Sequence, residues 1–280
     1  MKRIGLVGCG IMGSAIAELA ARSGLEVSVY VLDDEAAARG QERIAALLRR
    51  SARRDGLDEA QVAEVRARIV ISVDIDELRD CELVIEAVPE IEHVKLDVFR
   101  QLAATVSPTA ILASNTSSLS ITRLAGVTMQ PDRVVGLHFF NPASVLPLVE
   151  LVTTAHTAPE VISVVEDLVG ETLGKSIVRV PDTPGFIVNA LLIPYICSAI
   201  RMVETGVPAA SVDSAMTLGC SHPMGPLRLA DLIGLDTVHS IASSLYEASG
   251  NPHDAPPMLL SQMVDAGVLG NKTQGGFYSR

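Results

Sequence analysis

The chain has 280 residues, of which 48% are hydrophobic and 20% are charged, a balance that excludes a disordered, collagen-like or coiled-coil protein. Aspartate and glutamate outnumber lysine and arginine by 33 to 22, which gives a formal net charge of -11. Binding to nucleic acid or to an anionic membrane is therefore not expected, because both select a basic face.

Strand-like and helix-like segments alternate over the first two thirds of the chain. Short β-rich runs lie at Arg3–Val7, Glu26–Val31, Ile69–Ser72, Leu83–Ala87, Ile111–Ser114, Val134–His138, Leu148–Val152 and Ile177–Val180. Helical spacing occupies Ser14–Ser23, Glu35–Arg54, Asp58–Arg68, Ile91–Ala104 and Pro159–Leu173. This alternation predicts an α/β fold in which helices cover both faces of a doubly wound, mostly parallel sheet.

The pattern changes after residues 181–185, where prolines and a glycine punctuate the chain. No strand is expected beyond this point. Helices are expected at Phe186–Glu204, Ala209–Leu218, Leu227–Ile233, Thr237–Ser249 and Pro257–Ala266. We therefore predict a sheet-containing domain at residues 1–183 and a smaller all-helical domain at residues 184–280.

The most apolar later stretch, Phe186–Val203, contains Asn189, Pro194 and Arg201, so it predicts a buried helix at a subunit interface rather than a membrane span. The four cysteines are far apart and form no C-x-x-C pair, which indicates reduced thiols in a cytoplasmic protein. No secretory leader is expected, because glycines interrupt the first apolar run. No metal site is predicted.

The segment Gly8-Cys9-Gly10-Ile11-Met12-Gly13 fits the pattern G-x-G-x-x-G. It follows the first strand and opens a helix, where glycines let a pyrophosphate approach the backbone N–H groups of the helix N-terminus. A purely structural glycine turn is the alternative. The context favours dinucleotide binding by Gly8, Gly10, Ile11, Met12 and Gly13.

Asp33 follows the second strand, about 20 residues after the third glycine, which is the usual place of an acid that hydrogen-bonds the adenosine ribose. No arginine or lysine is adjacent to receive a 2′-phosphate, so NAD is favoured, with NADP as the alternative. Asp33 is equally suited to cap the helix that is expected to start at Glu35.

A lone histidine, His138, ends one predicted strand, and ligands bind at that edge of an open α/β sheet. Glu150 lies in the next predicted strand, between the apolar residues Val149 and Leu151. A buried carboxylate needs a partner, and an imidazole that the carboxylate orients is an economical one. A glutamate that caps a loop is the alternative.

Polar residues follow another strand, within Ala113–Ser118. They are placed either to cap the helix expected at residues 120–125 or to point hydroxyl groups at a substrate oxygen. Asn189 is a polar residue in a hydrophobic helix, which indicates a buried hydrogen-bonding role.

Together these segments resemble the L-3-hydroxyacyl-CoA dehydrogenase family, in its short bacterial 3-hydroxybutyryl-CoA dehydrogenase form with actinobacterial character. The resemblance covers the whole chain and rests on Gly8–Gly13, Val84–Ala87, Ala113–Leu119, His138–Pro142, Glu150, Pro184–Asn189 and His222–Pro226. It implies a Rossmann-type NAD-binding domain, a helical C-terminal domain that forms a homodimer, and a short-chain 3-hydroxyacyl-CoA as substrate.

By this resemblance, His138 takes the proton of the 3-hydroxyl group as hydride leaves C3 for NAD, and Glu150 pairs with His138. Ser117 and Asn189 hydrogen-bond the reacting oxygen and help to place the acyl group. Asn141, within the matched segment His138–Pro142, is assigned to the substrate site together with Ser117.

The resemblance also assigns Glu90, Lys95 and Asn115 to the cofactor side of the site. Arg50 and Arg54 fall where family members carry lysines that meet CoA, and a spacing of four residues places them on one helix face. A solvated basic face is the alternative for these two arginines.

Three positions depart from the family pattern. Val31 stands where members usually carry Asp or Glu at the end of the second strand, which puts the cofactor preference in question. Asn189 is followed by Ala190 instead of arginine, as in some actinobacterial relatives. Gln274 replaces a glycine near the C-terminus, which is expected to reshape that loop.

Three rival functions stay open on the sequence. The same chemistry on a hydroxyacyl group carried by an acyl carrier protein is the first, and a non-catalytic nucleotide-binding or structural protein is the second. A dehydrogenase of a free hydroxy acid is the third. It is disfavoured because such an enzyme would more naturally use a lysine in the helix where this chain has Asn189.

Overall fold

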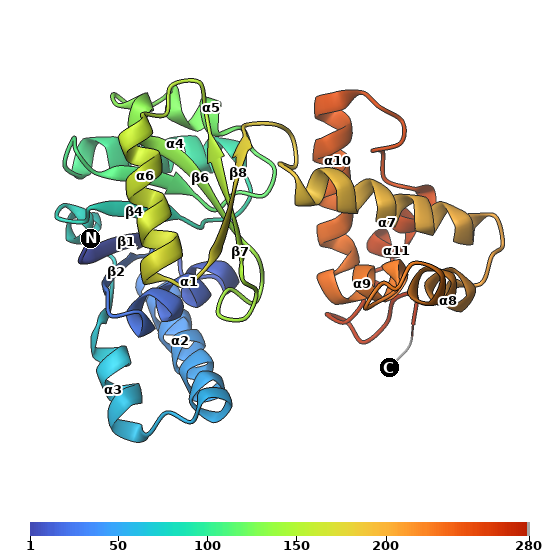
Figure 1. Ribbon diagram of the computed structural model, residues 1–280, viewed down its shortest axis with the longest axis horizontal. Coiled ribbons are helices and arrows are strands. Elements are labelled where there is room, and N and C mark those ends of the chain that lie inside the picture. Colours follow the sequence, from blue (N-terminus) through green and yellow to red (C-terminus); the bar gives the residue numbers. More distant parts are fainter. Residues whose placement is uncertain (279–280) are drawn as a thin grey trace. The chain divides into compact units, whose positions relative to one another are not determined.

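The computed structural model describes residues 1–278. The chain forms two compact units, Met1–Asp182 and Thr183–Arg280, which are called the first and second unit below. The first unit contains an eight-stranded sheet in the order β3-β2-β1-β4-β5-β6-β7-β8 (Figure 1). Neighbouring strands run parallel except for β6 and β7, which are antiparallel.

The strands are β1 Arg3–Val7, β2 Glu26–Tyr30, β3 Ile69–Ser72, β4 Leu83–Glu86, β5 Ile111–Ser114, β6 Val134–Phe139, β7 Leu148–Thr153 and β8 Ser176–Pro181. The helices of the first unit are α1 Ile11–Arg22, α2 Asp34–Asp55, α3 Glu59–Ala67, α4 Glu92–Thr105, α5 Ile121–Ala125 and α6 Pro159–Asp167. Short 3-10 turns lie at Ile75–Leu78 and Pro131–Arg133. The predicted α/β fold with a doubly wound, mostly parallel sheet is confirmed.

The core of the first unit explains why helices cover both sheet faces. Buried residues of α1, α2 and α6 form one apolar cluster with alternate strand residues such as Leu6 and Ile85. On the opposite face, Phe99 of α4 and Ile121 of α5 are fully buried. Gly136 of β6 leaves room for Ile121, since a Cβ there would lie 3.0 Å from its side chain. Strands buried on both faces read as continuous apolar runs, as the sequence does.

The second unit is helical. Its helices are α7 Val188–Glu204, α8 Ala209–Gly219, α9 Pro226–Ile233, α10 Leu235–Ser249 and α11 Met258–Asp265. They enclose their own core, in which Ile196, Cys197 and Leu245 are among the buried residues. Over the described residues, a single pair of bridge residues, Gly270 and Gly275, adds extended backbone to this unit.

Two predicted helices differ from the observed ones. The helix expected to run to Leu173 ends as α6 at Asp167, and a π-helical turn continues it over Leu168–Thr172. The helix expected from Phe186 begins at Val188, because Phe186 has a φ of 55°, which is left-handed and incompatible with an α-helix. The other predicted boundaries lie within three residues of the observed ones. None of the helices within residues 1–278 combines the length and apolar character needed to cross a membrane.

Candidate active site

His138 and Glu150 face each other across the one antiparallel pair of strands. They are register partners in β6 and β7, and directly opposite residues on neighbouring strands project from the same face of a sheet. Nδ1 of His138 lies 2.7 Å from Oε2 of Glu150. The histidine is 5% exposed and the glutamate is fully buried. The structure therefore brings together the two residues whose pairing the sequence predicted.

This arrangement fixes the roles of the two imidazole nitrogens. A carboxylate only accepts hydrogen bonds, so the Nδ1 atom that it contacts carries the proton and Nε2 is the basic nitrogen. The Phe140 ring packs against the imidazole, with ring centroids 4.4 Å apart and planes tilted by 54°, and so limits its rotation. An oriented imidazole with a buried counter-charge is suited to general acid–base catalysis.

Ser117 lies in a turn after β5, at the same carboxyl edge of the sheet. Glu90 organises this turn through Oε1, which accepts hydrogen bonds from the N–H groups of Ser117 at 3.0 Å and Ser118 at 3.2 Å. The hydroxyl groups of Thr116 and Ser118 also donate to this oxygen. Lys95 forms an ion pair with Oε2 of Glu90 at 3.2 Å. The carboxylate of Glu90 therefore holds the turn in place.

The pKa of Glu90 lies below its ordinary value. Burial of the carboxyl group opposes ionisation, but the charge of Lys95 and the hydrogen bonds from Thr116 and Ser117 outweigh that effect. Glu90 thus stays a carboxylate at neutral pH and keeps its full capacity to accept hydrogen bonds from the turn.

Asn115 follows β5 and Asn141 follows β6, and the two side chains differ in their surroundings. Oδ1 of Asn115 accepts the backbone N–H of Phe139 at 3.0 Å, so its side chain links the ends of β5 and β6. Asn141 is exposed in the segment after β6 and precedes a cis peptide bond to Pro142.

The glycine-rich segment connects β1 to α1 at this same edge. Gly8 has a φ of 94°, and a Cβ there would lie 2.8 Å from the carbonyl oxygen of Ala87. A Cβ on Gly13 would overlap the carbonyl oxygen of Gly8 even more closely. Gly10 is the N-cap of α1, and no side chain caps this helix end. Its N–H groups are therefore available to a ligand's phosphate, so the residues present fit a dinucleotide.

The comparisons with known proteins decide the family. Residues 3–183 match the family described as "3-hydroxyacyl-CoA dehydrogenase, NAD binding domain", and residues 185–280 match its "C-terminal domain". The chain belongs to the 3-hydroxyacyl-CoA dehydrogenase family. This confirms the resemblance inferred from the sequence, and with it an NAD-dependent dehydrogenase.

Similar proteins cover the chain from end to end. A 3-hydroxybutyryl-CoA dehydrogenase of Mycobacterium tuberculosis is 48% identical over 100% of this chain and 98% of its own length. The crystal structure of M. tuberculosis FadB2 has a TM-score of 0.98 at 48% identity and covers 100% of this chain and 99% of that one. The (S)-3-hydroxybutyryl-CoA dehydrogenase PaaH1 of Ralstonia eutropha has a TM-score of 0.93 at 41% identity, covering 100% and 99% of the two chains.

Val31 and Asp33 lie between β2 and α2, where the sequence departs from the usual family pattern. Val31 is 4% exposed and packs in the core. Oδ1 of Asp33 accepts the N–H of Ala36 at 2.7 Å and caps α2, which is the capping alternative left open by the sequence. A ribose contact by Asp33 stays a prediction, because a capping carboxylate has a second oxygen.

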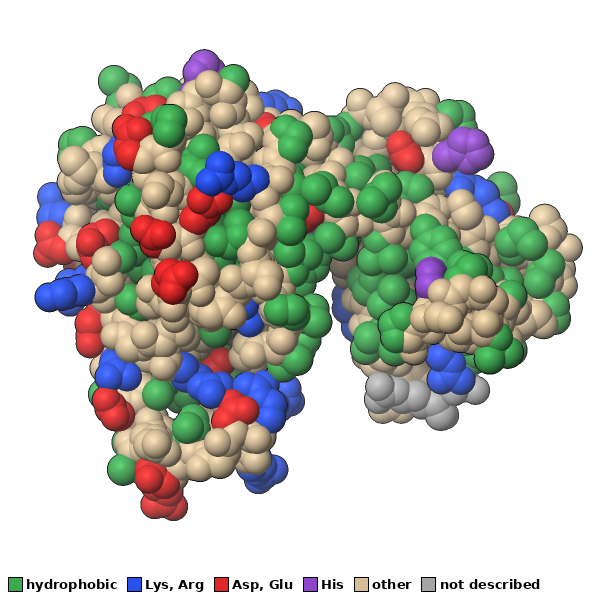
Figure 2. All heavy atoms as spheres, viewed as in Figure 1, with side chains coloured by type: hydrophobic (Ala, Val, Ile, Leu, Met, Phe, Trp, Pro, Cys, Tyr) green, Lys and Arg blue, Asp and Glu red, His purple; other side chains and the backbone are tan. Residues whose placement is uncertain are grey.

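The predicted CoA arginines lie on α2, where Figure 2 shows basic side chains gathered with acidic ones among them. Arg50 is exposed. Arg54 donates two hydrogen bonds to Asp55, at 2.8 and 2.9 Å, and Arg22 also contacts Asp55 at 2.7 Å. The hydrogen bonds from Arg54 and Arg22 lower the pKa of Asp55 to about 2. Arg54 can therefore bind a phosphate only if it breaks its hydrogen bonds to Asp55 or if its guanidinium group contacts Asp55 and the phosphate together.

Asn189 belongs to the second unit, where it is 7% exposed in the first turn of α7. The sequence correctly placed it as a buried polar residue of a hydrophobic helix. Its role at the reacting oxygen stays a prediction.

One buried charged residue at this edge of the sheet, Glu86, was not among the site residues predicted from the sequence. Glu86 ends β4, is fully buried, and accepts hydrogen bonds from Lys95, Ser114 and Val88. The signal was a charged residue at the end of the apolar run Val84-Ile85-Glu86, the same signal that drew attention to Glu150.

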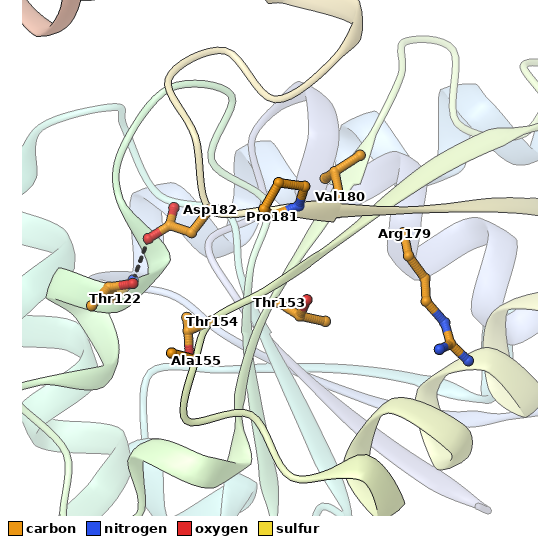
Figure 3. A pocket seen from close by; sticks show the side chains of 8 residues that line it. All are labelled: Thr122, Thr153, Thr154, Ala155, Arg179, Val180, Pro181 and Asp182. Carbon is orange, nitrogen blue, oxygen red and sulfur yellow. Dashed lines mark hydrogen bonds between the residues drawn. The ribbon is translucent and has the colours of Figure 1, made fainter.

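A hollow of about 580 Å³ elsewhere in the first unit does not share this chemistry. It is lined by Thr122, Thr153, Thr154, Ala155, Arg179, Val180, Pro181 and Asp182 (Figure 3). Asp182 accepts the N–H groups of Ile121 and Thr122 and the hydroxyl of Ser120, while Arg179 pairs with Glu166. Both charged groups already have structural partners, so this hollow is a weaker candidate than the site of His138.

Proposed function

We propose that this protein catalyses the reversible, NAD-dependent oxidation of (S)-3-hydroxybutyryl-CoA to acetoacetyl-CoA. The observation that carries the proposal is the 2.7 Å contact between Nδ1 of His138 and Oε2 of Glu150 at the carboxyl edge of the sheet. Relatives that span the full chain carry the name of this activity. The proposal takes the first unit as the NAD-binding domain and the second as the substrate and dimerisation domain.

In the direction of oxidation, Nε2 of His138 accepts the proton of the 3-hydroxyl group. Glu150 stabilises the imidazolium that results, and it keeps Nδ1 protonated throughout. The bound NAD supplies the hydride acceptor for the hydrogen on C3. Ser117 and Asn189 hydrogen-bond the reacting oxygen. In the direction of reduction, His138 returns the proton to the 3-keto oxygen.

The glycine-rich segment holds the cofactor in this proposal. Gly8, Gly10 and Gly13 leave the space for the pyrophosphate, and the open N-terminus of α1 provides backbone donors. Glu90, Lys95 and Asn115 belong to the cofactor side of the site in this proposal. NAD is the cofactor, and Asp33 at the end of β2 disfavours a 2′-phosphate through its negative charge.

The carrier end of the substrate needs positive charge despite the acidic total of the chain. Arg50 and Arg54 provide it on α2, with Asn141 nearer to the acyl group. An acyl carrier protein thioester is the alternative substrate. We further propose a homodimer, because α7 presents Leu191 at 70% exposure in an apolar groove that Leu192, Tyr195 and Met224 also line. The four cysteines are free thiols, which supports the proposal of a cytoplasmic protein.

The first experiment is the initial rate of acetoacetyl-CoA reduction, followed by the loss of reduced-nicotinamide absorbance with NADH and with NADPH. Fast turnover with NADH is the expected result. A preference for NADPH would keep the reaction and overturn the proposed role of Asp33. Turnover with the carrier-protein thioester alone would change the substrate class, and cofactor binding without turnover of any thioester would favour a non-catalytic protein.

A further inference from the structure

Glu86 is a buried carboxylate that none of the predicted roles uses. It is the last residue of β4, its side chain is fully buried, and its register partners are Val7 in β1 and Ser114 in β5. A carboxylate in such a place is costly unless its oxygens are hydrogen-bonded or paired with a charge. Its partners therefore indicate what it does.

The partners of Glu86 come from three separate segments. Oε1 accepts hydrogen bonds from Nζ of Lys95 at 2.6 Å and from the N–H of Val88 at 2.7 Å. Oε2 accepts the hydroxyl of Ser114 at 2.6 Å. One side chain thus joins α4, the segment after β4 and the end of β5.

Lys95 extends this network through Glu90 towards the turn of Ser117. Besides Glu86, Nζ of Lys95 contacts Oε2 of Glu90 at 3.2 Å and the carbonyl oxygen of Val88 at 3.3 Å. An ammonium group has three N–H donors, and Lys95 is 1% exposed. These three contacts match its three donors, so in this arrangement Lys95 holds Glu90, which in turn holds the turn of Ser117.

Glu86 is also linked to the cofactor side. The residue after it, Ala87, donates its N–H to the carbonyl of Val7 at 2.8 Å. The carbonyl oxygen of Ala87 is the atom that a Cβ on Gly8 would meet at 2.8 Å. The backbone of Ala87 therefore packs directly against the glycine-rich segment. A displacement of Glu86 would move this backbone on the cofactor side and Lys95 on the side of Ser117.

We propose that Glu86 is a positioning residue that couples the cofactor segment at Gly8 to the hydroxyl turn at Ser117, acting through Lys95 and Ser114. The inference rests on the proposed function and deepens it. Binding of the nicotinamide cofactor and of the acyl thioester are coupled through this one carboxylate. The lowered pKa of Glu90 agrees with such a charged link.

Glu86→Gln breaks the coupling with little change in side-chain size. The amide oxygen can still accept from Lys95 and Val88 at the Oε1 position, but the negative charge opposite the ammonium group is lost, and the NH2 group at the Oε2 position can no longer accept from the Ser114 hydroxyl. Small displacements of a reacting group have large effects on rate. We expect kcat/KM for acetoacetyl-CoA to fall roughly tenfold to a hundredfold.

The test measures the affinity of NAD+ by calorimetry with and without saturating acetoacetyl-CoA, a pair that cannot react because both members are oxidised. The ratio of the two dissociation constants is the coupling factor. We expect this factor to differ from one in the wild-type protein and to approach one in Glu86→Gln. Glu86→Asp, which restores the charge, is expected to recover part of it.

Two variants separate positioning from mere stability. Glu82 is an exposed glutamate just before β4, and its Oε2 atom accepts the N–H groups of Lys2 and Arg3. Glu82→Gln removes the charge of this glutamate and should keep the wild-type coupling factor. The double variant Glu86→Gln, Lys95→Met removes the ion pair between Glu86 and Lys95, and it also removes the counter-charge of Glu90. Because the link to Glu90 is then missing altogether, the coupling factor should stay close to one whatever the melting temperature of this variant.

The outcomes distinguish this inference from the proposed function. If the wild-type protein reduces acetoacetyl-CoA and Glu86→Gln keeps both the wild-type rate and the wild-type coupling factor, the role of Glu86 is wrong and the proposed function stands. The same holds if the double variant regains the wild-type coupling factor. If the wild-type protein has no turnover, the proposed function fails and the coupling assigned to Glu86 fails with it.

Discussion

Each unit contains a buried carboxylate that joins two segments of the chain. One of these carboxylates has a titratable partner, and the other has partners that do not titrate near neutral pH. Glu150 in the first unit contacts the ring of His138, a group that gains and loses a proton. Asp213 in the second unit accepts the N–H groups of Leu227 at 2.8 Å and Arg228 at 3.0 Å, and the hydroxyl of Tyr278 at 2.7 Å.

Both carboxylates are buried, so burial alone does not distinguish a carboxylate that is proposed to take part in catalysis from one that only stabilises the fold. The hydrogen-bond partner distinguishes them. Asp213 is a residue of α8 whose carboxylate lies at the N-terminus of α9, where a negative charge is favoured by the helix dipole, and its donors keep their protons at neutral pH. It fastens the C-terminal segment to α8 and α9. In the proposed mechanism the charge of Glu150's partner changes, so the stabilisation that Glu150 provides changes during the reaction.

The largest effect is expected when the titratable partner is removed. His138→Gln should lower kcat for acetoacetyl-CoA reduction by roughly a thousandfold, since general acid–base catalysis contributes on the order of 10²–10⁴. His156→Gln changes an exposed histidine after β7 and should keep the wild-type rate. Steady-state kinetics and a melting curve check both. Near-normal turnover of a folded His138→Gln would contradict the mechanism.

Removing only the charge of Glu150 should have the next largest effect. In Glu150→Gln the amide oxygen still accepts from Nδ1, but the imidazolium loses its counter-charge, so kcat should fall about a hundredfold. KM for acetoacetyl-CoA should change far less than kcat, because the carboxylate acts on charge that forms during the reaction. An equal rise in KM at constant kcat would make Glu150 a binding residue instead.

The structural carboxylate should respond in stability rather than in rate. Asp213→Asn places an NH2 group among donors and should lower the free energy of unfolding by about 2 kcal/mol, measured by urea denaturation. The rate per folded molecule should stay within about twofold. Asp265→Asn, at the exposed end of α11, should leave stability unchanged. A loss of kcat larger than the loss of folded protein would remove the distinction between the two carboxylates.

The smallest effect is expected at the loop that the C-terminal segment follows. Gln274 has a φ of 60°, a left-handed conformation that costs a non-glycine residue about 1–2 kcal/mol. Gln274→Gly should relieve that cost and lose part of the gain to the greater freedom of glycine in the unfolded chain, for a net increase of about 0.5 kcal/mol. Gln274→Ala keeps a Cβ and should gain nothing. A gain equal to that of glycine would show that strain is not the cause.

Regular elements were predictable because their signals are local. Continuous β-rich runs predicted β3 and β5 with their observed ends, and the glycine pattern predicted the turn into α1. The π-helical turn after Asp167 and the late start of α7 depend on packing and on a left-handed Phe186, which no local pattern displays.

The site was predictable to the extent that its residues are neighbours in the sheet. His138 and Glu150 lie on consecutive strands, so a buried acid near a strand-end histidine was enough to pair them. Glu86 has partners in α4 and β5, and only the folded sheet brings these segments together. Glu90 and Lys95 were assigned to the cofactor side from the family pattern, and their contact with each other appears only in the structure.

The antiparallel pairing of β6 and β7 has an evolutionary consequence. Because the register of two adjacent strands sets the separation of His138 and Glu150 and Phe140 packs against the imidazole, residues 141–147 do not have to hold the pair together. That connecting segment can change in length and composition while the acid–base pair is inherited unchanged.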